Sequence, residues 1–205
     1  MTVGPTSQST GVHLHDRPVV RLRPGKERPV RQRHPWVFSG AIRQVEGSPA
    51  PGALVEVEDA GGRWLARGYF NSRSQISVRI LTWDPDEVVD GAFWQRRLAA
   101  SAGARAGLAM DPATSAYRLA YAESDCLPGL VVDRYAAGGG EDVWLVVQFL
   151  TAGVEMRRAE ILDALEALFA PLGIVDRSDV DVRRHEGLPF HSDSCRLPDR
   201  SRSSM

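Results

Sequence analysis

The first third of the chain alternates apolar and polar residues with the period of a β-strand. Leu54–Glu58 places its two valines on one face and its two glutamates on the other, and Ile76–Ile80 repeats the pattern with three inward apolar residues. Asp59–Gly62 predicts a turn, after which Arg63–Phe70 returns as a strand. Short strands at this spacing predict a small β-barrel or sandwich over residues 19–85.

A helical period replaces the alternation beyond Asp84–Asp86, where a proline lies between two aspartates. Asp90 is a typical N-cap, and the residues that follow it predict a helix to about Ala106. The clearest helix is Gly153–Ala170, whose apolar residues form one stripe and which ends before a proline. Within the first region, only Arg28–His34 favours a helical turn.

Two continuous apolar runs, Leu130–Val132 and Val143–Phe149, predict covered strands, and Ile174–Val175 predicts a shorter one. The glycine-rich segment Ala136–Asp142 is expected to be a flexible connection between the first two. Strands mixed with helices in this way predict a mixed α/β domain over residues 90–190. The chain as a whole is therefore expected to be α+β, with a small β-barrel followed by this second domain.

Both ends of the chain lack a hydrophobic period. Residues 1–18 are expected to form a disordered leader, because they lack the basic start and apolar middle of a signal peptide. His191–Met205 is rich in Ser, Arg and Asp, and residues 191–205 are expected to form a disordered tail. No apolar run approaches the ~20 residues of a membrane span, so a cytoplasmic protein without a membrane partner is expected.

Charge is segregated along the sequence. Arg17–Arg43 carries eight Lys and Arg residues against Glu27, a net charge of +7, whereas the whole chain has a net charge of −1. Such segregation is typical of a surface that binds a polyanion, most often nucleic acid. The aromatic and turn residues of this segment indicate that it belongs to a packed domain. The alternative interpretation is a solvated charged face with no ligand.

Eight residues are candidates for RNA contacts. Cationic side chains bind phosphate, and an imidazole or indole ring stacks on a base. Trp36 is open to two interpretations, a stacking residue or a core residue. For the two candidates near residue 183, the alternative is a capped, solvated turn. The predicted RNA-binding residues are Lys26, Arg28, Arg31, Arg33, His34, Arg43, Arg183 and Arg184.

No self-contained catalytic or metal site is predicted. Cys126 and Cys195 lie far apart and form no metal-binding pair. The spacing of Asp176, Asp179 and Asp181 matches no calcium loop. The sequence contains no P-loop, no H-E-x-x-H and no G-x-S-x-G motif, and its Ser-Asp and Pro-Gly pairs near residue 126 are typical of turns.

Five segments form a recognisable set: HPWVFSGAI (34–42), WLARGYFN (64–71), YRLAYAESDCLPGLVVDRY (117–135), the long helix after Thr151, and DRSDVDVRRHEG (176–187). Together they resemble the N-terminal half of the RlmI-type methyltransferases, which methylate cytosine in the large ribosomal RNA with S-adenosylmethionine. The resemblance covers about Val19 to Pro189. Position 126 is Cys where the family typically has Gly, so this cysteine is not taken as the family's nucleophile.

The resemblance implies a PUA-like RNA-binding β-barrel at residues 19–85 and the central α/β domain of the family at residues 90–190. In the family, a C-terminal Rossmann-like domain holds the methyl donor and the catalytic cysteine. This sequence shows neither the Gly-rich turn that a donor site needs nor a cysteine in a matching motif. We therefore expect no catalytic residue and no cofactor for this chain alone. S-adenosylmethionine is implied for the complete family member.

The expected function is that of the RNA-binding N-terminal portion of a 23S rRNA cytosine methyltransferase, without the catalytic domain and inactive alone. Ribosomal RNA is the expected partner, together with a catalytic domain that is missing or separately encoded. Two alternatives stay open: one half of a split, working rRNA methyltransferase, and a protein-interaction module that does not bind RNA. The sequence does not set the oligomeric state.

Overall fold

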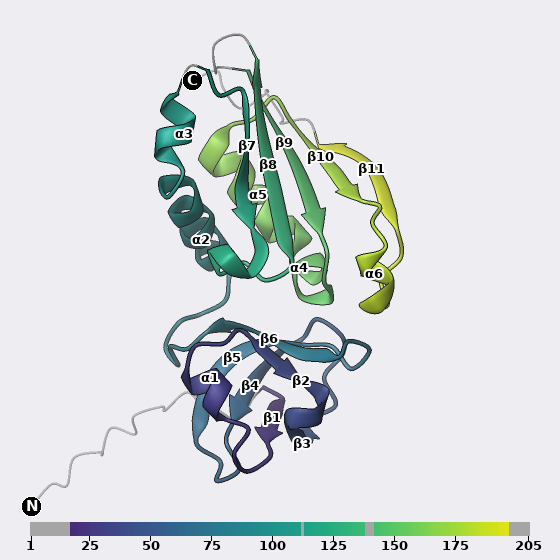
Figure 1. The fold of residues 1–205 in the computed structure, drawn as a ribbon. Helices are drawn as coiled ribbons and strands as arrows, with labels where there is room; N and C mark the ends of the chain where they lie inside the picture. The colour runs from purple at the N-terminus through teal and green to yellow at the C-terminus, as the bar shows by residue number, and fades with distance from the viewer. Residues whose placement is uncertain (1–16, 112, 138–141, 197–205) are drawn as a thin grey trace, which may run out of the picture.

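Two β-sheets make up the structure, a computed structural model, and they lie one above the other (Figure 1). The structure describes residues 17–111, 113–137 and 142–196. Helices and mixed sheets occur together, so the α+β class predicted from the sequence is confirmed. Among the described residues, no helix is long and apolar enough to cross a membrane.

The first sheet has six strands and curls around a small apolar core (Figure 1). The strands are β1 (Val19–Leu22), β2 (Trp36–Phe38), β3 (Ile42–Glu46), β4 (Leu54–Glu58), β5 (Trp64–Phe70) and β6 (Ile76–Thr82). They lie in the order β2-β6-β5-β4-β1-β3, and every pair is antiparallel except β1 with β4. A single helical turn, α1 (Arg28–Arg31), and a 3-10 turn, η1 (Ser39–Ala41), complete this part.

The alternation of β4 explains the core of this sheet. Val55 and Val57 are fully buried, as the pattern predicted. Glu56, which lies between them on the opposite face, is buried as well. Its carboxylate accepts Nε of Arg67 at 2.8 Å and the indole N–H of Trp64 at 2.7 Å. The burial of this charge is tolerated because both of its oxygens are paired.

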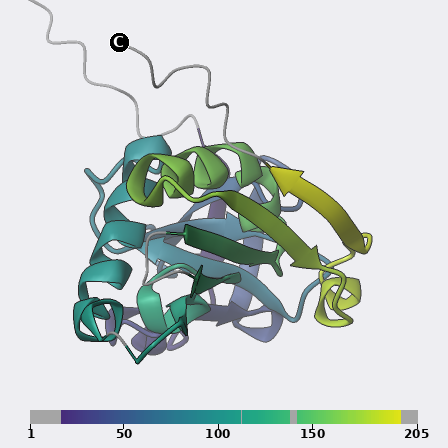
Figure 2. The same cartoon turned by 90° about the horizontal axis from the view of Figure 1, so that it is seen from above.

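The second sheet has five strands, β7 (Ala116–Tyr121), β8 (Leu130–Ala137), β9 (Asp142–Phe149), β10 (Gly173–Ser178) and β11 (His191–Arg196). They lie in the order β11-β10-β9-β8-β7, and only β9 and β10 are parallel. The helical segments are α2 (Gly91–Gly103), α3 (Ala106–Met110), η2 (Ala122–Asp125), α4 (Ala152–Met156), α5 (Arg158–Phe169) and α6 (Val182–His185). Helices α2 and α5 contact each other beside the sheet (Figure 2) and share its apolar core.

Two predicted helices differ from the observed ones. The N-cap at Asp90 is confirmed, because its carboxylate accepts a backbone N–H of the first turn at 2.9 Å, but α2 is shorter than predicted and the separate α3 follows it. The predicted helix Gly153–Ala170 is divided into α4 and α5 at Arg157. The Arg157 side chain donates to the carbonyl oxygens of Gly52 and Gly153, each at 2.9 Å, and so ties the break to the first sheet.

The structure differs from the prediction at both ends of the chain. The predicted disordered tail is a strand over its first six residues, since β11 pairs antiparallel with β10 at the edge of the sheet. Backbone hydrogen bonds form this edge strand without a hydrophobic period. Two residues of the predicted leader are held on the first sheet: Arg17 pairs with Glu56 at 3.2 Å, and the carbonyl oxygen of Pro18 accepts the N–H of Glu56 at 2.9 Å. The rest of the leader (1–16), residues 138–141 of the predicted connection and residues 197–205 lie outside the described residues.

Buried polar contacts join the two sheets. The hydroxyl of Tyr69, on β5, donates to the carbonyl oxygen of Pro128 at 3.1 Å and lies 2.7 Å from the hydroxyl of Thr151. Burial raises the pKa of Tyr69 far above its ordinary value, so the hydroxyl keeps its proton. Gly153, in α4, packs directly against the Tyr69 ring. The first sheet is therefore fastened to the α4 end of the second.

Candidate nucleic-acid interface

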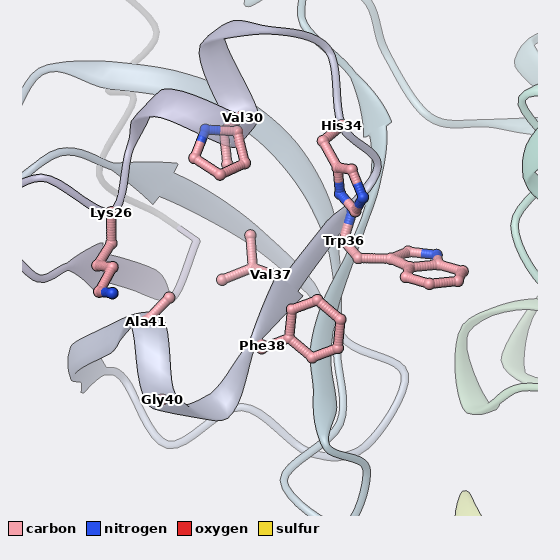
Figure 3. A pocket seen from close by; sticks show the side chains of 9 residues that line it. Lys26, Val30, His34, Trp36, Val37, Phe38, Gly40 and Ala41 are labelled. Atoms are coloured by element: carbon pink, nitrogen blue, oxygen red, sulfur yellow. The ribbon is translucent and has the colours of Figure 1, made fainter.

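An open cleft of about 440 Å³ lies on the first sheet beside α1 (Figure 3). The chain leaves α1, passes through β2 and turns at η1, so most of the walls come from one short stretch of sequence. The cleft is lined mainly by apolar and aromatic side chains, with one lysine at its rim. The lining residues are Lys26, Pro29, Val30, His34, Trp36, Val37, Phe38, Gly40 and Ala41.

Three aromatic rings stand together in this cleft, on the side away from Lys26 (Figure 3). The ring centroids of His34 and Trp36 are 5.7 Å apart and those of Trp36 and Phe38 are 6.2 Å apart, both edge-to-face. Phe38 is 48% exposed, although it belongs to a strand whose central residue, Val37, is buried. Exposed rings at the edge of a cleft provide surfaces on which planar groups stack.

Trp36 is neither a core residue nor a fully exposed one, and its stacking on a base stays a prediction. The residue is half-buried, and its indole N–H donates to Oε1 of Glu123 at 2.7 Å, which is a structural contact. The guanidinium of Arg79 lies 5.9 Å from the centroid of the same ring. Trp36 also lines the cleft, so part of its surface faces that open space. The Trp36 backbone N–H donates to Nδ1 of His34 at 3.2 Å, and this hydrogen bond orients the His34 ring next to Trp36.

Three of the predicted cationic residues have no ion-pair partner among the described residues, and one of them lines the cleft. Lys26 lines it, Arg28 belongs to α1, whose residues form one wall, and Arg43 follows shortly after η1. All three side chains are exposed, and none has an ion-pair partner among the described residues. Cationic groups in this state are available to phosphate oxygens.

Two other predicted residues are engaged within the protein. Arg31 forms an ion pair with Asp59, with Nη2 2.8 Å from Oδ2. The backbone N–H of Arg63 bonds to Asp59 and holds the pKa of that carboxyl below its ordinary value, so Asp59 stays charged for Arg31. The guanidinium of Arg33 lies over the Trp83 ring, 5.3 Å from its centroid. Both cations keep exposed surface but are held by partners.

Ion pairs in the first sheet also neutralise part of the positive charge of Arg17–Arg43. Arg17 pairs with Glu56 at 3.2 Å, and Arg21 pairs with Glu46 at 3.3 Å and Glu58 at 3.0 Å. The net charge of +7 along the sequence therefore overstates the positive charge on the surface. Five cations of this segment have no acidic partner among the described residues: Arg23, Lys26, Arg28, Arg33 and Arg43.

The prediction that Arg183 contacts RNA is wrong. Its side chain is 1% exposed, because α6 turns it toward the end of β9. There it pairs with Glu155 at 2.8 Å and donates to the carbonyl oxygen of Phe149. Arg184, the next residue, is exposed and lies over the Phe190 ring at 4.6 Å. Neither residue lines the cleft of the first sheet.

A second cavity of about 450 Å³ has lining residues from both sheets. Arg33 and Trp83 line it from one side, and Glu123 and Cys126 line it from the other. Cys126 is exposed and has a φ of 56°, a left-handed conformation that favours glycine. Among the described residues, no group of three or more His, Cys, Asp or Glu side chains could hold a metal ion.

Sequence reasoning missed Phe38 as a site residue. The available signal was the alternation of β2, which places Phe38 on the same face as Trp36 and opposite the buried Val37. An aromatic residue predicted on the outer face of a strand, beside a second aromatic residue, would have identified it.

The comparison with sequence families agrees with this geometry. Residues 20–83 match the family described as the PUA-like domain. Apart from Val19 at the start of β1, the matched residues span all six strands of the first sheet and the whole cleft. The first sheet is therefore a PUA-like domain.

Curated relatives extend the similarity into the second sheet. The chain is 44% identical over 167 residues to the ribosomal RNA large subunit methyltransferase I of Cronobacter sakazakii, and 43% identical over 167 residues to that of Escherichia coli. Each match covers 82% of this chain and 41% of the relative. Over these residues the chain is an RlmI-type sequence, as its motifs predicted. It spans about two fifths of the length of the relatives that it matches.

Solved structures show the same fold at low identity. A putative SAM-dependent methyltransferase from Streptococcus mutans superposes with a TM-score of 0.65 at 15% identity, covering 78% of this chain and 40% of that one. A putative methyltransferase complexed with SAH gives a TM-score of 0.65 at 16% identity over the same shares. At this identity the similarity establishes the arrangement of the two sheets alone.

Proposed function

We propose that this chain is the RNA-binding portion of a SAM-dependent methyltransferase that acts on cytosine in 23S rRNA. The observation that carries the proposal is the cleft of the first sheet, where aromatic rings line one side and the unpaired Lys26 lies on the other. Aromatic rings stack on bases without regard to sequence, and cations bind the backbone phosphates. The 43–44% identity to ribosomal RNA methyltransferases supports ribosomal RNA as the nucleic acid.

The two sheets correspond to two proposed domains. Residues 19–85 form the PUA-like RNA-binding unit, and residues 90–190 form the central α/β unit. The segment between them carries the Asp84-Pro85-Asp86 turn, and the two cores contain different residues. We propose that the first unit contacts RNA and that the second unit holds the residues of the cleft in place.

Methyl transfer is not assigned to any described residue. The exposed Cys126 lies in a strained turn beside the second cavity, and the sequence shows no strand that runs through a Gly-rich turn into a helix, as a methyl-donor site needs. We therefore expect no uptake of S-adenosylmethionine by this polypeptide alone. Isothermal titration calorimetry tests this, and stoichiometric tight binding of S-adenosylmethionine would contradict it. A split enzyme would show activity only when a second chain is added.

Phe38 provides the first test of the cleft. Phe38→Ala is expected to weaken binding to single-stranded fragments of 23S rRNA by roughly 5- to 100-fold, because stacking contributes about 1–3 kcal/mol per base. The matched control is Tyr135→Ala, since Tyr135 on β8 is also 48% exposed and lies on the other sheet. Fluorescence anisotropy measures both affinities. Equal losses for the two variants would contradict the assignment of the cleft.

The salt dependence of binding is the second test. Three phosphate contacts predict that log K falls against log salt concentration with a slope of about −2 on single strands, at about −0.7 for each contact. Affinities measured between low and high salt give this slope directly. A protein-interaction module predicts no RNA binding even at low salt, so that result would favour this alternative.

A further inference from the structure

We propose that Glu123 is a positioning residue for the RNA cleft: it holds the Trp36 ring in the cleft wall from the opposite sheet. The inference rests on the proposed function, because it concerns the affinity of the same cleft. It makes the RNA affinity of the first sheet depend on a side chain of the second. The PUA-like unit binds RNA at full strength only when the central unit supplies this carboxylate.

One carboxylate oxygen receives two donors from the first sheet. Oε1 of Glu123 accepts the indole N–H of Trp36 at 2.7 Å and Nη1 of Arg79 at 2.9 Å. Trp36 on β2 and Arg79 on β6 are directly opposite each other in the strand register. The carboxylate therefore fixes a cross-strand pair in which the guanidinium also lies 5.9 Å from the indole centroid.

The contact continues into the second sheet. Nη2 of Arg79 pairs with Glu186 at 3.1 Å, and the Glu186 carboxylate also accepts Nδ2 of Asn71 at 2.8 Å. The side chains of Arg79, Glu123 and Glu186 are 12%, 21% and 3% exposed. Water screens these groups much less than it screens a surface ion pair, so they define a fixed geometry.

Trp36 depends on this support because of its place in the fold. β2 is an end strand of the first sheet, so only β6 fixes its backbone from one side. The ring is half-buried and lines the cleft, where its rotation would remove the wall between His34 and Phe38. Glu123 comes from η2, which is closed by left-handed residues at Ala122 and Cys126. This tight turn places the carboxylate at the junction of the two sheets.

The RNA affinity of Glu123 variants distinguishes two roles of this residue: positioning of the Trp36 ring and electrostatic repulsion of phosphate. If Glu123 only repels phosphate, Glu123→Ala removes a negative charge and tightens RNA binding. If it positions Trp36, Glu123→Ala weakens binding despite the lost charge, by about 5-fold or more. Glu123→Gln keeps an acceptor for the indole N–H and is expected to retain most of the affinity.

The matched control is Glu87→Ala. Glu87 also lines the second cavity, is 19% exposed against 21% for Glu123, and pairs with Arg97 instead of the cleft residues. It is expected to leave RNA affinity unchanged or slightly increased. Exchange of the Trp36 indole proton with solvent, followed by NMR, is expected to accelerate in Glu123→Ala and not in Glu87→Ala.

Two results overturn the proposal in distinguishable ways. Unchanged or tighter RNA binding by a folded Glu123→Ala variant, with binding by the unaltered chain intact, contradicts the positioning role alone. Absence of RNA binding by the unaltered chain contradicts the proposed function and this role with it. If Glu123→Ala does not fold, Glu123→Gln decides: slow indole exchange with retained affinity supports the role, and fast exchange with retained affinity contradicts it.

Discussion

Reversal of three of the predicted cations, in the triple variant Lys26→Glu, Arg28→Glu and Arg43→Glu, is expected to weaken RNA binding by about 100-fold or more at low salt. Each lost phosphate contact removes about 1 kcal/mol or more, and the introduced carboxylates repel the backbone. The fold should persist, because all three side chains are exposed and have no ion-pair partner among the described residues. Anisotropy titrations against 23S rRNA fragments measure the loss.

A control with the same change of net charge separates local contact from bulk attraction. The triple variant Arg96→Glu, Arg118→Glu and Arg177→Glu alters three exposed arginines beside the second sheet. Each forms a surface ion pair, whose loss costs about 0–1 kcal/mol. The account predicts a much smaller loss of affinity for this control. Similar losses for both triple variants would show that net charge, and not the cleft, determines binding.

Gly153→Ala is expected to destabilise the protein by about 1–3 kcal/mol and to loosen the junction of the two sheets. A Cβ at this position would overlap the ring of Tyr69, which is 1% exposed and fixed at its hydroxyl by Pro128 and Thr151. The ring therefore cannot move aside without losing both contacts. Thermal unfolding followed by circular dichroism measures the change.

Gly107→Ala is the matched control for this helix glycine. Gly107 lies in α3, and a Cβ there would meet no described atom within 4 Å. The substitution is expected to be neutral or to stabilise the protein by up to about 1 kcal/mol, because alanine favours a helix more than glycine does. An unchanged melting temperature for Gly153→Ala would contradict the packing of α4 on the first sheet.

Hydrophobic periodicity predicted most elements because each part of this chain buries one face. The alternation in β4 and β6 placed their valines in the core, and the cap at Asp90 followed from local chemistry alone. The break at Arg157 could not be predicted, because it depends on a carbonyl group of Gly52, which is distant in sequence. The edge strand β11 was missed because its pairing is carried by backbone groups.

The candidate site was predicted in part, because local charge says which residues are cationic but not which are paired. Arg31 forms an ion pair with Asp59, and Arg183 forms one with Glu155 in the protein interior. In both pairs the partner is distant in sequence. Lys26 and Arg28 have no ion-pair partner in the part of the chain that the structure describes. A run of basic residues therefore predicts a nucleic-acid surface only if enough of its cations remain unpaired. The sequence does not show which of them form ion pairs with acidic residues in the fold.

The central claim is that RNA lies in the cleft of the first sheet, and ultraviolet cross-linking tests it most directly. The protein would be irradiated with 23S rRNA fragments and digested with trypsin, which cleaves after Arg33 and Arg43 and so releases residues 34–43 with all three rings of the cleft. The account predicts that this peptide carries the main cross-link. Cross-links confined to the peptides that contain Tyr135 or Trp144, with none on residues 34–43, would contradict it.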